Sequence, residues 1–272
     1  MDFYNKVVII TGASAGIGAT TAEMFAKQSA KLVLVGRNQD NLLKVAQKCE
    51  EAKGIKPLAL AADLSHDSDV KRIVAETIKT FGRIDVLVNN AAVGVCAGIK
   101  DGIEPYDLVM TCNMRAVYLL TSLAVPHLIA SKGNVVNVSS VAALKPNKDV
   151  NFTPYCISKA ALDQFTRCIA LELGPDGVRV NSVNPGCTRT SFAENAGFSK
   201  EVVSKLCEDR DKNCPLRRMA EREDVADLIL YLACDRARSI TGSIHVIDNG
   251  EMLILLQSAI RHSQCKTVLS SL

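Results

Sequence analysis

Short, continuously apolar segments alternate with longer amphipathic segments along nearly the whole chain. Seven of them are rich in β-branched residues and are expected to be strands: Val7–Thr11, Leu32–Val35, Leu58–Ala62, Asp85–Asn89, Asn134–Ser139, Arg179–Val183 and Ile244–Asp248. Because most of these runs are apolar throughout rather than at every second residue, they suit strands buried on both faces of a parallel sheet.

The segments between these strands are predicted to be helices. The first has apolar residues on one face from Ile17 to Gln28, and the others are Gln39–Lys53, Asp67–Phe81, Pro105–Ser131, Pro154–Leu173 and Arg222–Cys234. Strands that alternate with helices predict an α/β fold, with a doubly wound sheet of about seven parallel strands and helices on both faces.

Two stretches depart from the alternation. Cys187–Glu221 is long, mixed in charge and partly helical, and an insertion of this kind beside the carboxyl edge of a sheet usually covers a substrate. Residues 253–272 follow the last strand and form either a docking helix or a frayed tail. For a chain of 272 residues we therefore expect a single domain over 1–252, followed by this tail.

The composition excludes several classes of protein. Apolar residues make up 48% and charged residues 22% of the chain, and a net charge of +3 gives no general attraction to nucleic acid or acidic membranes. The apolar runs are far shorter than the ~20 residues that span a bilayer, and the N-terminus lacks the pattern of a secretory signal. The ten cysteines form no C-x-x-C pair, so no metal site is expected. We expect them to be buried free thiols in a protein of a reducing, cytoplasmic compartment.

A glycine-rich loop, Thr11-Gly12-Ala13-Ser14-Ala15-Gly16-Ile17-Gly18, joins the first strand to the first helix. In an open α/β sheet dinucleotides bind at this junction, because glycines let the backbone approach a pyrophosphate that sits on the free N–H groups of the helix. The spacing G-x-x-x-G-x-G, taken alone, is also compatible with a simple turn. Its position favours a phosphate site that involves Gly12, Ser14, Ala15, Gly16, Ile17 and Gly18.

The end of the second strand indicates which dinucleotide is bound. A carboxylate there would accept hydrogen bonds from the adenosine ribose and repel a 2′-phosphate, but Gly36 and Arg37 occupy this position. A cation with no nearby acid favours the 2′-phosphate, so we expect NADP(H) in preference to NAD. The alternative is that Arg37 is an ordinary surface arginine.

Tyr155 and Lys159 are four residues apart in a predicted helix and therefore share one face. A free tyrosine, with a pKa of ~10, is a poor acid–base at neutral pH, but a nearby ammonium and a cationic nicotinamide both lower that pKa. Such a tyrosine can protonate a carbonyl oxygen as hydride arrives, or deprotonate an alcohol in reverse. Ser139 and Ser140 end the fifth strand, and a hydroxyl there can hold the same substrate oxygen.

With these motifs in this order, the chain resembles a short-chain dehydrogenase/reductase of the single-domain, Rossmann-like type. The resemblance runs up to about Gly250 and rests on Thr11–Gly18, Asp63-Leu64, Asn89-Asn90-Ala91-Ala92, Asn113, Ser140, Tyr155 with Lys159, Asn184-Pro185-Gly186, Ile240-Thr241-Gly242 and Asp248-Asn249-Gly250. It implies that Tyr155 is the catalytic acid–base and that Lys159 lowers its pKa and binds the nicotinamide ribose. Ser140, which precedes Val141 as in the family motif, would orient the substrate oxygen, and Asn113 would hold a water that links Lys159 to solvent.

The resemblance also implies the contacts of the cofactor. Asp63 and Leu64 would flank the adenine, Asn90 and Ala91 would line the cleft, and Pro185, Gly186, Thr188 and Thr190 would cradle the carboxamide. From the residues alone, Asn113 reads as a helix asparagine beside a polar neighbour, and Asp63 as a helix cap. Two departures are notable: Ala92 replaces a glycine of the family, and Lys145–Phe152 lengthens the spacing from Ser140 to Tyr155.

These features favour an NADP(H)-dependent enzyme that interconverts a small secondary alcohol and a ketone. The alternatives are a catalytically silent dinucleotide-binding redox sensor or partner subunit, and a methyltransferase, which leaves the tyrosine–lysine pair unexplained. Apolar candidates for the substrate pocket are Val93, Val95, Cys96, Leu144, Val150, Phe152, Phe192 and Phe198, whereas Arg189, Arg217 and Arg218 would suit an acidic substrate. The family implies a homo-oligomer, dimer or tetramer, formed through Tyr118–Leu128 and Ala160–Leu173, although these residues equally suit the core.

Overall fold

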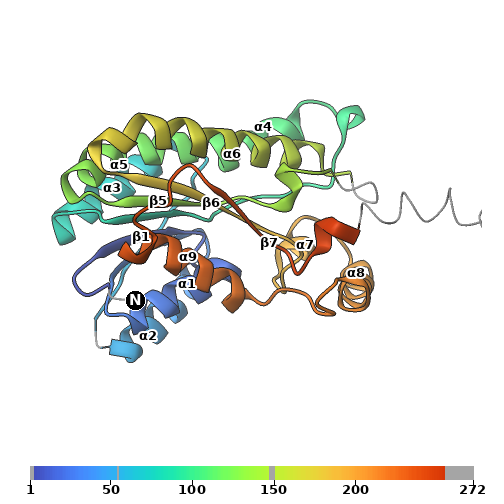
Figure 1. The fold of residues 1–272 in the computed structure, drawn as a ribbon, viewed down its shortest axis with the longest axis horizontal. Coiled ribbons are helices and arrows are strands. Elements are labelled where there is room, and N and C mark those ends of the chain that lie inside the picture. The colour runs from blue at the N-terminus through green and yellow to red at the C-terminus, as the bar shows by residue number, and fades with distance from the viewer. Residues whose placement is uncertain (1–2, 54, 147–150, 255–272) are drawn as a thin grey trace, which may run out of the picture.

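The computed structural model describes residues 3–53, 55–146 and 151–254, and its centre is one sheet of seven parallel strands (Figure 1). The strands lie in the order β3-β2-β1-β4-β5-β6-β7, so the order reverses between β1 and β4 and leaves a crevice at their carboxyl ends. The predicted doubly wound α/β fold is confirmed. The bounds of the strands are β1 (Val7–Thr11), β2 (Lys31–Gly36), β3 (Leu58–Ala61), β4 (Val86–Asn89), β5 (Asn134–Val138), β6 (Arg179–Pro185) and β7 (Ile244–Ile247).

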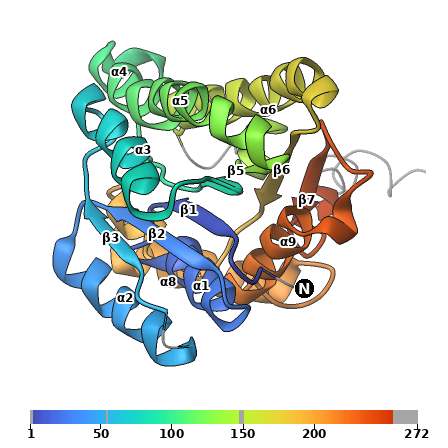
Figure 2. The same ribbon diagram turned by 90° about the vertical axis from the view of Figure 1, so that its left-hand side faces the viewer.

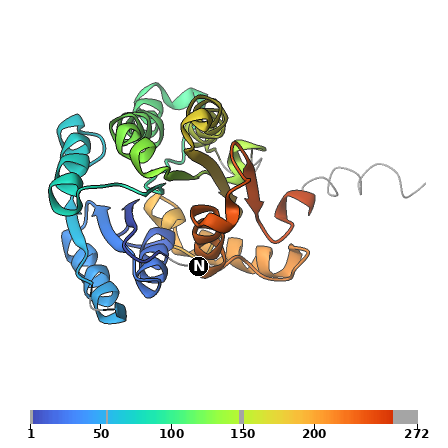
Figure 3. The ribbon, with the colours of Figure 1, turned by 60° about the vertical axis from the view of Figure 1, so that its left-hand side comes forward.

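Helices cover both faces of the sheet, as the views in Figures 2 and 3 show. Alternate residues of β1 point to opposite layers: Val8 and Ile10 pack with the α1, α2 and α9 side, and Val7 and Ile9 with the α3, α5 and α6 side. Burial on both faces explains why the strands read as continuous apolar runs. The helices are α1 (Gly16–Lys27), α2 (Gln39–Lys53), α3 (Asp67–Phe81), α4 (Glu104–Met110), α5 (Ala116–Ser131), α6 (Thr153–Leu173), α7 (Phe192–Asn195), α8 (Lys200–Asn213) and α9 (Arg222–Ala233).

The single helix predicted over Pro105–Ser131 is divided by a π-helical turn, Thr111–Arg115, between α4 and α5. The wider turn carries Asn113 inward, where its side chain bonds the loop after β4. By length and composition, Glu104–Ser131 is also apolar enough to cross a membrane. In this fold, however, Leu120, Ala124 and Leu128 of α5 are buried in the core on one face of the sheet.

The predicted insertion Cys187–Glu221 contains α7 and α8, which lie beyond the carboxyl ends of the strands, beside β7 in Figure 1. Residues 251–254, after β7, are helical. Most of the predicted tail, from residue 255 on, lies outside the described residues, as do residues 147–150 of the lengthened segment before Tyr155.

Candidate active site

A cavity of about 1340 Å³ lies at the carboxyl ends of the central strands. Ligand pockets usually measure ~300–1,000 Å³, so this one is large enough to hold a dinucleotide and a substrate together. Every predicted site residue lines it except Gly18 and Asn113, which lie just behind its wall; the lining set includes Gly12, Ser14, Ala15, Gly16, Ile17, Arg37, Asp63, Leu64, Asn90, Ala91, Ser140, Tyr155, Lys159, Pro185, Gly186, Thr188 and Thr190.

The glycine loop has the shape that a pyrophosphate requires. Gly12 and Gly16 adopt φ values of +67° and +57°, in the left-handed region that favours glycine. A Cβ on Gly18 would collide with the carbonyl oxygen of Gly12, so this glycine allows the loop to close on α1. The first turn of α1 has no acidic residue, and its N-cap, Ala15, has no side chain that could cap the free N–H groups. The loop therefore fits an anionic phosphate.

Asn90 lines the cavity but also supports the glycine loop. Its side-chain amide donates to the Thr11 carbonyl (2.8 Å), while the Thr11 hydroxyl accepts the N–H groups of Asn90 and Ala91, each at 3.0 Å. A Cβ on Gly12 would lie only 2.8 Å from the Asn90 amide nitrogen. These contacts fix the end of β4 against the glycine loop and so hold the loop in position for a phosphate.

The adenosine end of the cavity combines Arg37 with Asp63 and Ser14. Arg37 is exposed at the end of β2, and the position of a Cβ on Gly36 lies 3.0 Å from the Ser14 hydroxyl. The expectation of no acid near Arg37 is corrected, because the charges of Asp63 and Arg37 interact. The Asp63 carboxylate, however, accepts the N–H and O–H of Ser65 at 2.9 and 2.8 Å. These bonds hold the pKa of Asp63 below its ordinary value, to which Arg37 contributes further.

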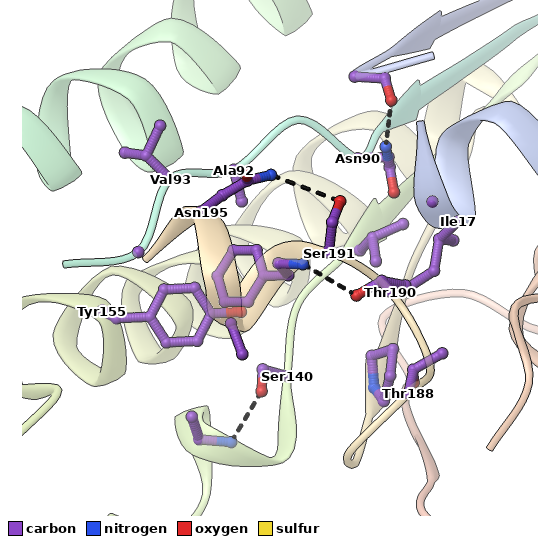
Figure 4. Close-up of a pocket in the computed structure, with 18 of the residues that line it drawn as sticks. Ile17, Asn90, Ala92, Val93, Ser140, Tyr155, Thr188, Thr190, Ser191 and Asn195 are labelled. Atoms are coloured by element: carbon purple, nitrogen blue, oxygen red, sulfur yellow. Dashed lines mark hydrogen bonds between the residues drawn. The ribbon is translucent and has the colours of Figure 1, made fainter. Parts of the chain in front are cut away.

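The hydroxyl-bearing residues meet on the opposite wall, where Figure 4 shows Tyr155 and Ser140 beside one another. Ser140 follows β5 and hydrogen-bonds Tyr155. The Ser139 hydroxyl instead donates to the Lys159 carbonyl (3.2 Å), so it is committed to holding α6 on the sheet. Lys159 is buried below the Tyr155 ring, with Nζ 5.6 Å from the ring centroid and 2.8 Å from the Val138 carbonyl oxygen to which it donates. A substrate oxygen at this wall would meet both Ser140 and Tyr155.

The protonation of this pair differs from the simple expectation. With the groups of this chain alone, burial raises the pKa of the Tyr155 phenol above its ordinary value, and the hydrogen bond with Ser140 offsets only part of the rise. Burial also lowers the pKa of Lys159 to about 8, and the charge of Asp163 opposes only part of this shift. The four-residue spacing correctly placed the two groups next to one another. The lowering of the tyrosine pKa that we expected also involves the bound nicotinamide, so it stays a prediction.

Asn113 acts as a clamp between two segments that flank the site. Its carbonyl oxygen accepts the Val93 N–H (2.8 Å), and its amide donates to the Val93 carbonyl (2.9 Å) and to the Ser158 hydroxyl (3.1 Å). These three hydrogen bonds occupy the Asn113 side chain with partners in the protein. They fix the loop after β4 beside α6 and so set the width of the cavity next to Tyr155.

A buried polar network behind Ser140 was not predicted from the sequence. Asn184 donates to the Ser140 carbonyl (3.0 Å) and to the Asp163 carboxylate (2.8 Å), which also accepts the Ser182 hydroxyl at 3.2 Å. Asp163 lies one helical turn after Lys159, so the spacing of Tyr155, Lys159 and Asp163 on one helix face was a signal that could have found it. The network holds the end of β5 in place.

The wall of the cavity next to Tyr155 is apolar. Some of the predicted apolar pocket residues line it, and others do not. Val93, Phe152, Phe192 and Phe198 line the cavity, whereas Val95, Cys96 and Leu144 do not; Val150 lies outside the described residues. Two arginines considered for an acidic substrate are already paired. Arg189 contacts Asp211 (2.5 Å) and Glu221 (3.0 Å), and Arg218 contacts Asp224 (2.6 Å).

Comparisons with known proteins agree with this geometry. The family model described as enoyl-(acyl carrier protein) reductase matches residues 12–251. A meso-2,3-butanediol dehydrogenase of Serratia marcescens is 35% identical over 251 residues, which cover 92% of this chain and 96% of that protein. Among solved structures, a short-chain dehydrogenase/reductase of unknown function from Caenorhabditis elegans, crystallised with cofactor, has a TM-score of 0.88 at 38% identity, covering 94% of this chain and 98% of that one.

Another solved structure, a 7α-hydroxysteroid dehydrogenase complexed with NADH and 7-oxo glycochenodeoxycholic acid, has a TM-score of 0.84 at 28% identity and covers 92% of this chain and 95% of that one. These matches extend over the whole fold, from the glycine loop to the segment after β7, and they confirm the resemblance that the motifs indicated. The chain therefore belongs to the short-chain dehydrogenase/reductase family of oxidoreductases, whose members use nicotinamide dinucleotides.

Proposed function

We propose that this protein is an NADP(H)-dependent oxidoreductase that interconverts a small secondary alcohol and a ketone, with Tyr155 as the acid–base. The observation that carries the proposal is the Tyr155 phenol beside the Ser140 hydroxyl, in the same cavity as the glycine loop. The test is consumption of NADPH by the purified chain with a panel of neutral ketones. Tight NADPH binding without turnover of any ketone or alcohol would favour the silent redox sensor or partner subunit instead.

Each residue would contribute a defined part of the reaction. The bound cofactor supplies or accepts the hydride. Tyr155 donates its phenolic proton to the carbonyl oxygen, and Ser140 donates a hydrogen bond that keeps this oxygen in place. Lys159, on the far side of the Tyr155 ring, would bind the nicotinamide ribose, and its charge would stabilise the phenolate that remains. Pro185, Gly186, Thr188 and Thr190 would hold the carboxamide, with Asp63 and Leu64 at the adenine.

The preference for NADP(H) is supported by Arg37, which is exposed at the end of β2 and lines the cavity together with Ser14. We expect Arg37→Leu to weaken NADPH binding by about tenfold, because a charge-assisted bond to the 2′-phosphate is lost, and to leave NADH binding nearly unchanged. Titration of both nucleotides by fluorescence measures this. Arg167→Leu, which removes an exposed arginine from α6, is the matched control. Equal weakening of both nucleotides would contradict a phosphate contact.

Self-association is supported by an aromatic pair on the outer face of α5 and α6. The Tyr118 side chain is exposed, and its ring centroid lies 5.6 Å from that of Phe165. An exposed apolar face of this kind commonly marks a protein interface. We expect the purified chain to sediment as a dimer or tetramer and Tyr118→Glu to sediment as a smaller species. A wild-type monomer at micromolar concentration would contradict this proposal.

A cytoplasmic location is supported by the state of the cysteines. All nine cysteines within the described residues are free thiols, as expected of a protein in a reducing compartment. Fractionation of cells that produce the chain tests this assignment, and recovery of the protein in a membrane or secreted fraction would contradict it.

A further inference from the structure

Four aromatic side chains meet at the substrate end of the cavity, and we name them the aromatic cluster: Phe152, Tyr155, Phe192 and Phe198. The Tyr155 ring centroid lies 4.9 Å from that of Phe152 and 5.3 Å from that of Phe192. Phe152 also contacts Phe198 (5.9 Å) and Phe192 (6.4 Å). Phe192 and Phe198 belong to Cys187–Glu221, which we name the covering segment, whereas Phe152 is the N-cap of α6 and Tyr155 lies in its first turn.

The three phenylalanines of the aromatic cluster lie beside the Tyr155 ring, and Phe152 and Phe192 each contact one face or edge of it. Only 8% of Tyr155 is exposed. On the other side, a Cβ on Gly94 would lie 2.7 Å from the tip of Phe152 and 2.8 Å from that of Phe192, so both rings rest against the bare backbone of the loop after β4. A ring attached to the carbonyl carbon of a substrate at this wall would therefore lie against these phenylalanines and take over contacts that they now make with one another.

The arginine and the two hydroxyl groups beside Phe192 are already engaged within the protein. Arg189 is held by Asp211 and Glu221, and Ser191 and Thr190 bond within the covering segment, to Asn195 and to the Phe192 N–H (Figure 4). Aromatic faces prefer flat partners that stack or meet edge to face, and a puckered ring cannot restore these contacts.

We propose that the aromatic cluster selects carbonyl compounds that carry a flat aromatic ring next to the carbonyl carbon, so that the ring replaces contacts between the phenylalanines while the oxygen reaches Tyr155 and Ser140. This inference rests on the proposed carbonyl reduction and adds the substrate class to it. It also gives the covering segment a role: Phe192 and Phe198 determine specificity, and the chemistry stays with α6 and β5.

The test compares acetophenone with cyclohexyl methyl ketone, which have the same carbon skeleton but a flat or a puckered ring. Because the two ketones differ in intrinsic reactivity, the quantity to measure is the change in their kcat/KM ratio between variants, with NADPH and the full chain. We expect Phe192→Leu and Phe198→Leu each to lower the acetophenone preference by about tenfold. The control Phe81→Leu, at the end of α3 and outside the cavity lining, leaves the ratio unchanged.

A second measurement does not depend on turnover. Benzamide and cyclohexanecarboxamide are unreactive mimics of the two ketones, and we expect the NADPH-bound wild type to bind benzamide about tenfold more tightly. If ketones are reduced but neither the ratio nor the amide affinities depend on Phe192 and Phe198, or if an unbranched acyl thioester is preferred, the inference is overturned while the proposed function stands. If benzamide is preferred but no carbonyl compound is reduced, the ring site stands and the proposed function fails.

Discussion

Replacing Tyr155 with phenylalanine is expected to lower kcat for ketone reduction by about 10²–10⁴-fold, the usual contribution of a positioned acid–base. The variant keeps the ring that contacts Phe152 and Phe192, so the wall of the cavity is preserved. It loses the hydroxyl that hydrogen-bonds Ser140 and that would give its proton to the substrate oxygen. The measurement is the steady-state rate of NADPH consumption with the best ketone of the panel.

Two controls separate loss of chemistry from loss of structure. Tyr231→Phe removes a phenol from α9, on the opposite side of the sheet, and should keep the wild-type rate. The affinity of Tyr155→Phe for NADPH should stay within a few fold of wild type, because the glycine loop and Arg37 are unchanged. Equal kcat values for Tyr155→Phe and wild type would remove the phenol from the mechanism.

The fold was largely predictable from the sequence because strands that are buried on both faces of a sheet are apolar at nearly every position. A strand such as β1 must be apolar at every position when Val8 and Ile10 pack on one layer and Val7 and Ile9 on the other. The π-helical turn at Thr111–Arg115 leaves no such sign in the sequence, because one wider turn hardly changes the pattern of an apolar helix. The turn places Asn113 so that it bonds Val93, a tertiary contact that the local sequence does not reveal.

In the site, local spacing predicted the neighbours but not their surroundings. Tyr155 and Lys159 share a helix face, as expected from four-residue spacing. Burial raises the pKa of Tyr155, and its ring contacts Phe152 and also Phe192, which reaches it from the covering segment. Local spacing cannot predict the contact between Phe192 and Tyr155, because these residues are far apart in the sequence. Local spacing also did not show which of Ser139 and Ser140 faces the substrate, and only the family motif favoured Ser140. In the structure the Ser139 hydroxyl bonds the Lys159 carbonyl, whereas Ser140 bonds Tyr155.

A buried ion pair shows how the covering segment is anchored. Arg210 is the buried residue of α8, at 7% exposure, and its Nε lies 3.1 Å from the Glu251 carboxylate, which is 6% exposed. The same carboxylate accepts the N–H of Cys187 at 2.8 Å and its thiol at 3.4 Å. Because Cys187 follows Gly186 of the expected carboxamide cradle, Glu251 joins α8 to the cofactor side of the cavity.

Breaking this pair is expected to release α8. Removing one partner of a buried ion pair costs ~3–5 kcal/mol, and since α8 buries no other side chain, opening this helix is the least costly way to rehydrate the remaining charge. In Glu251→Gln we therefore expect hydrogen exchange of the α8 amides to accelerate by about a hundredfold, which corresponds to ~3 kcal/mol at 1.4 kcal/mol per tenfold change. The KM for the ketone should rise, because Phe198 is attached to this helix by its N-cap, Ser199.

The double variant Arg210→Met/Glu251→Gln decides whether the pair itself carries this effect. It leaves no unpaired charge, so its α8 amides should exchange more slowly than those of Glu251→Gln. If the two substitutions acted independently, their effects on the exchange free energy would add instead, and exchange would be faster. Lys212→Met breaks an exposed pair with Glu208 on the same helix, 3.7 Å apart, and should change little. If the effects of Glu251→Gln and of Arg210→Met, each measured alone, simply add in the double variant, α8 is held by packing, and the charge of Glu251 has no part in positioning the covering segment.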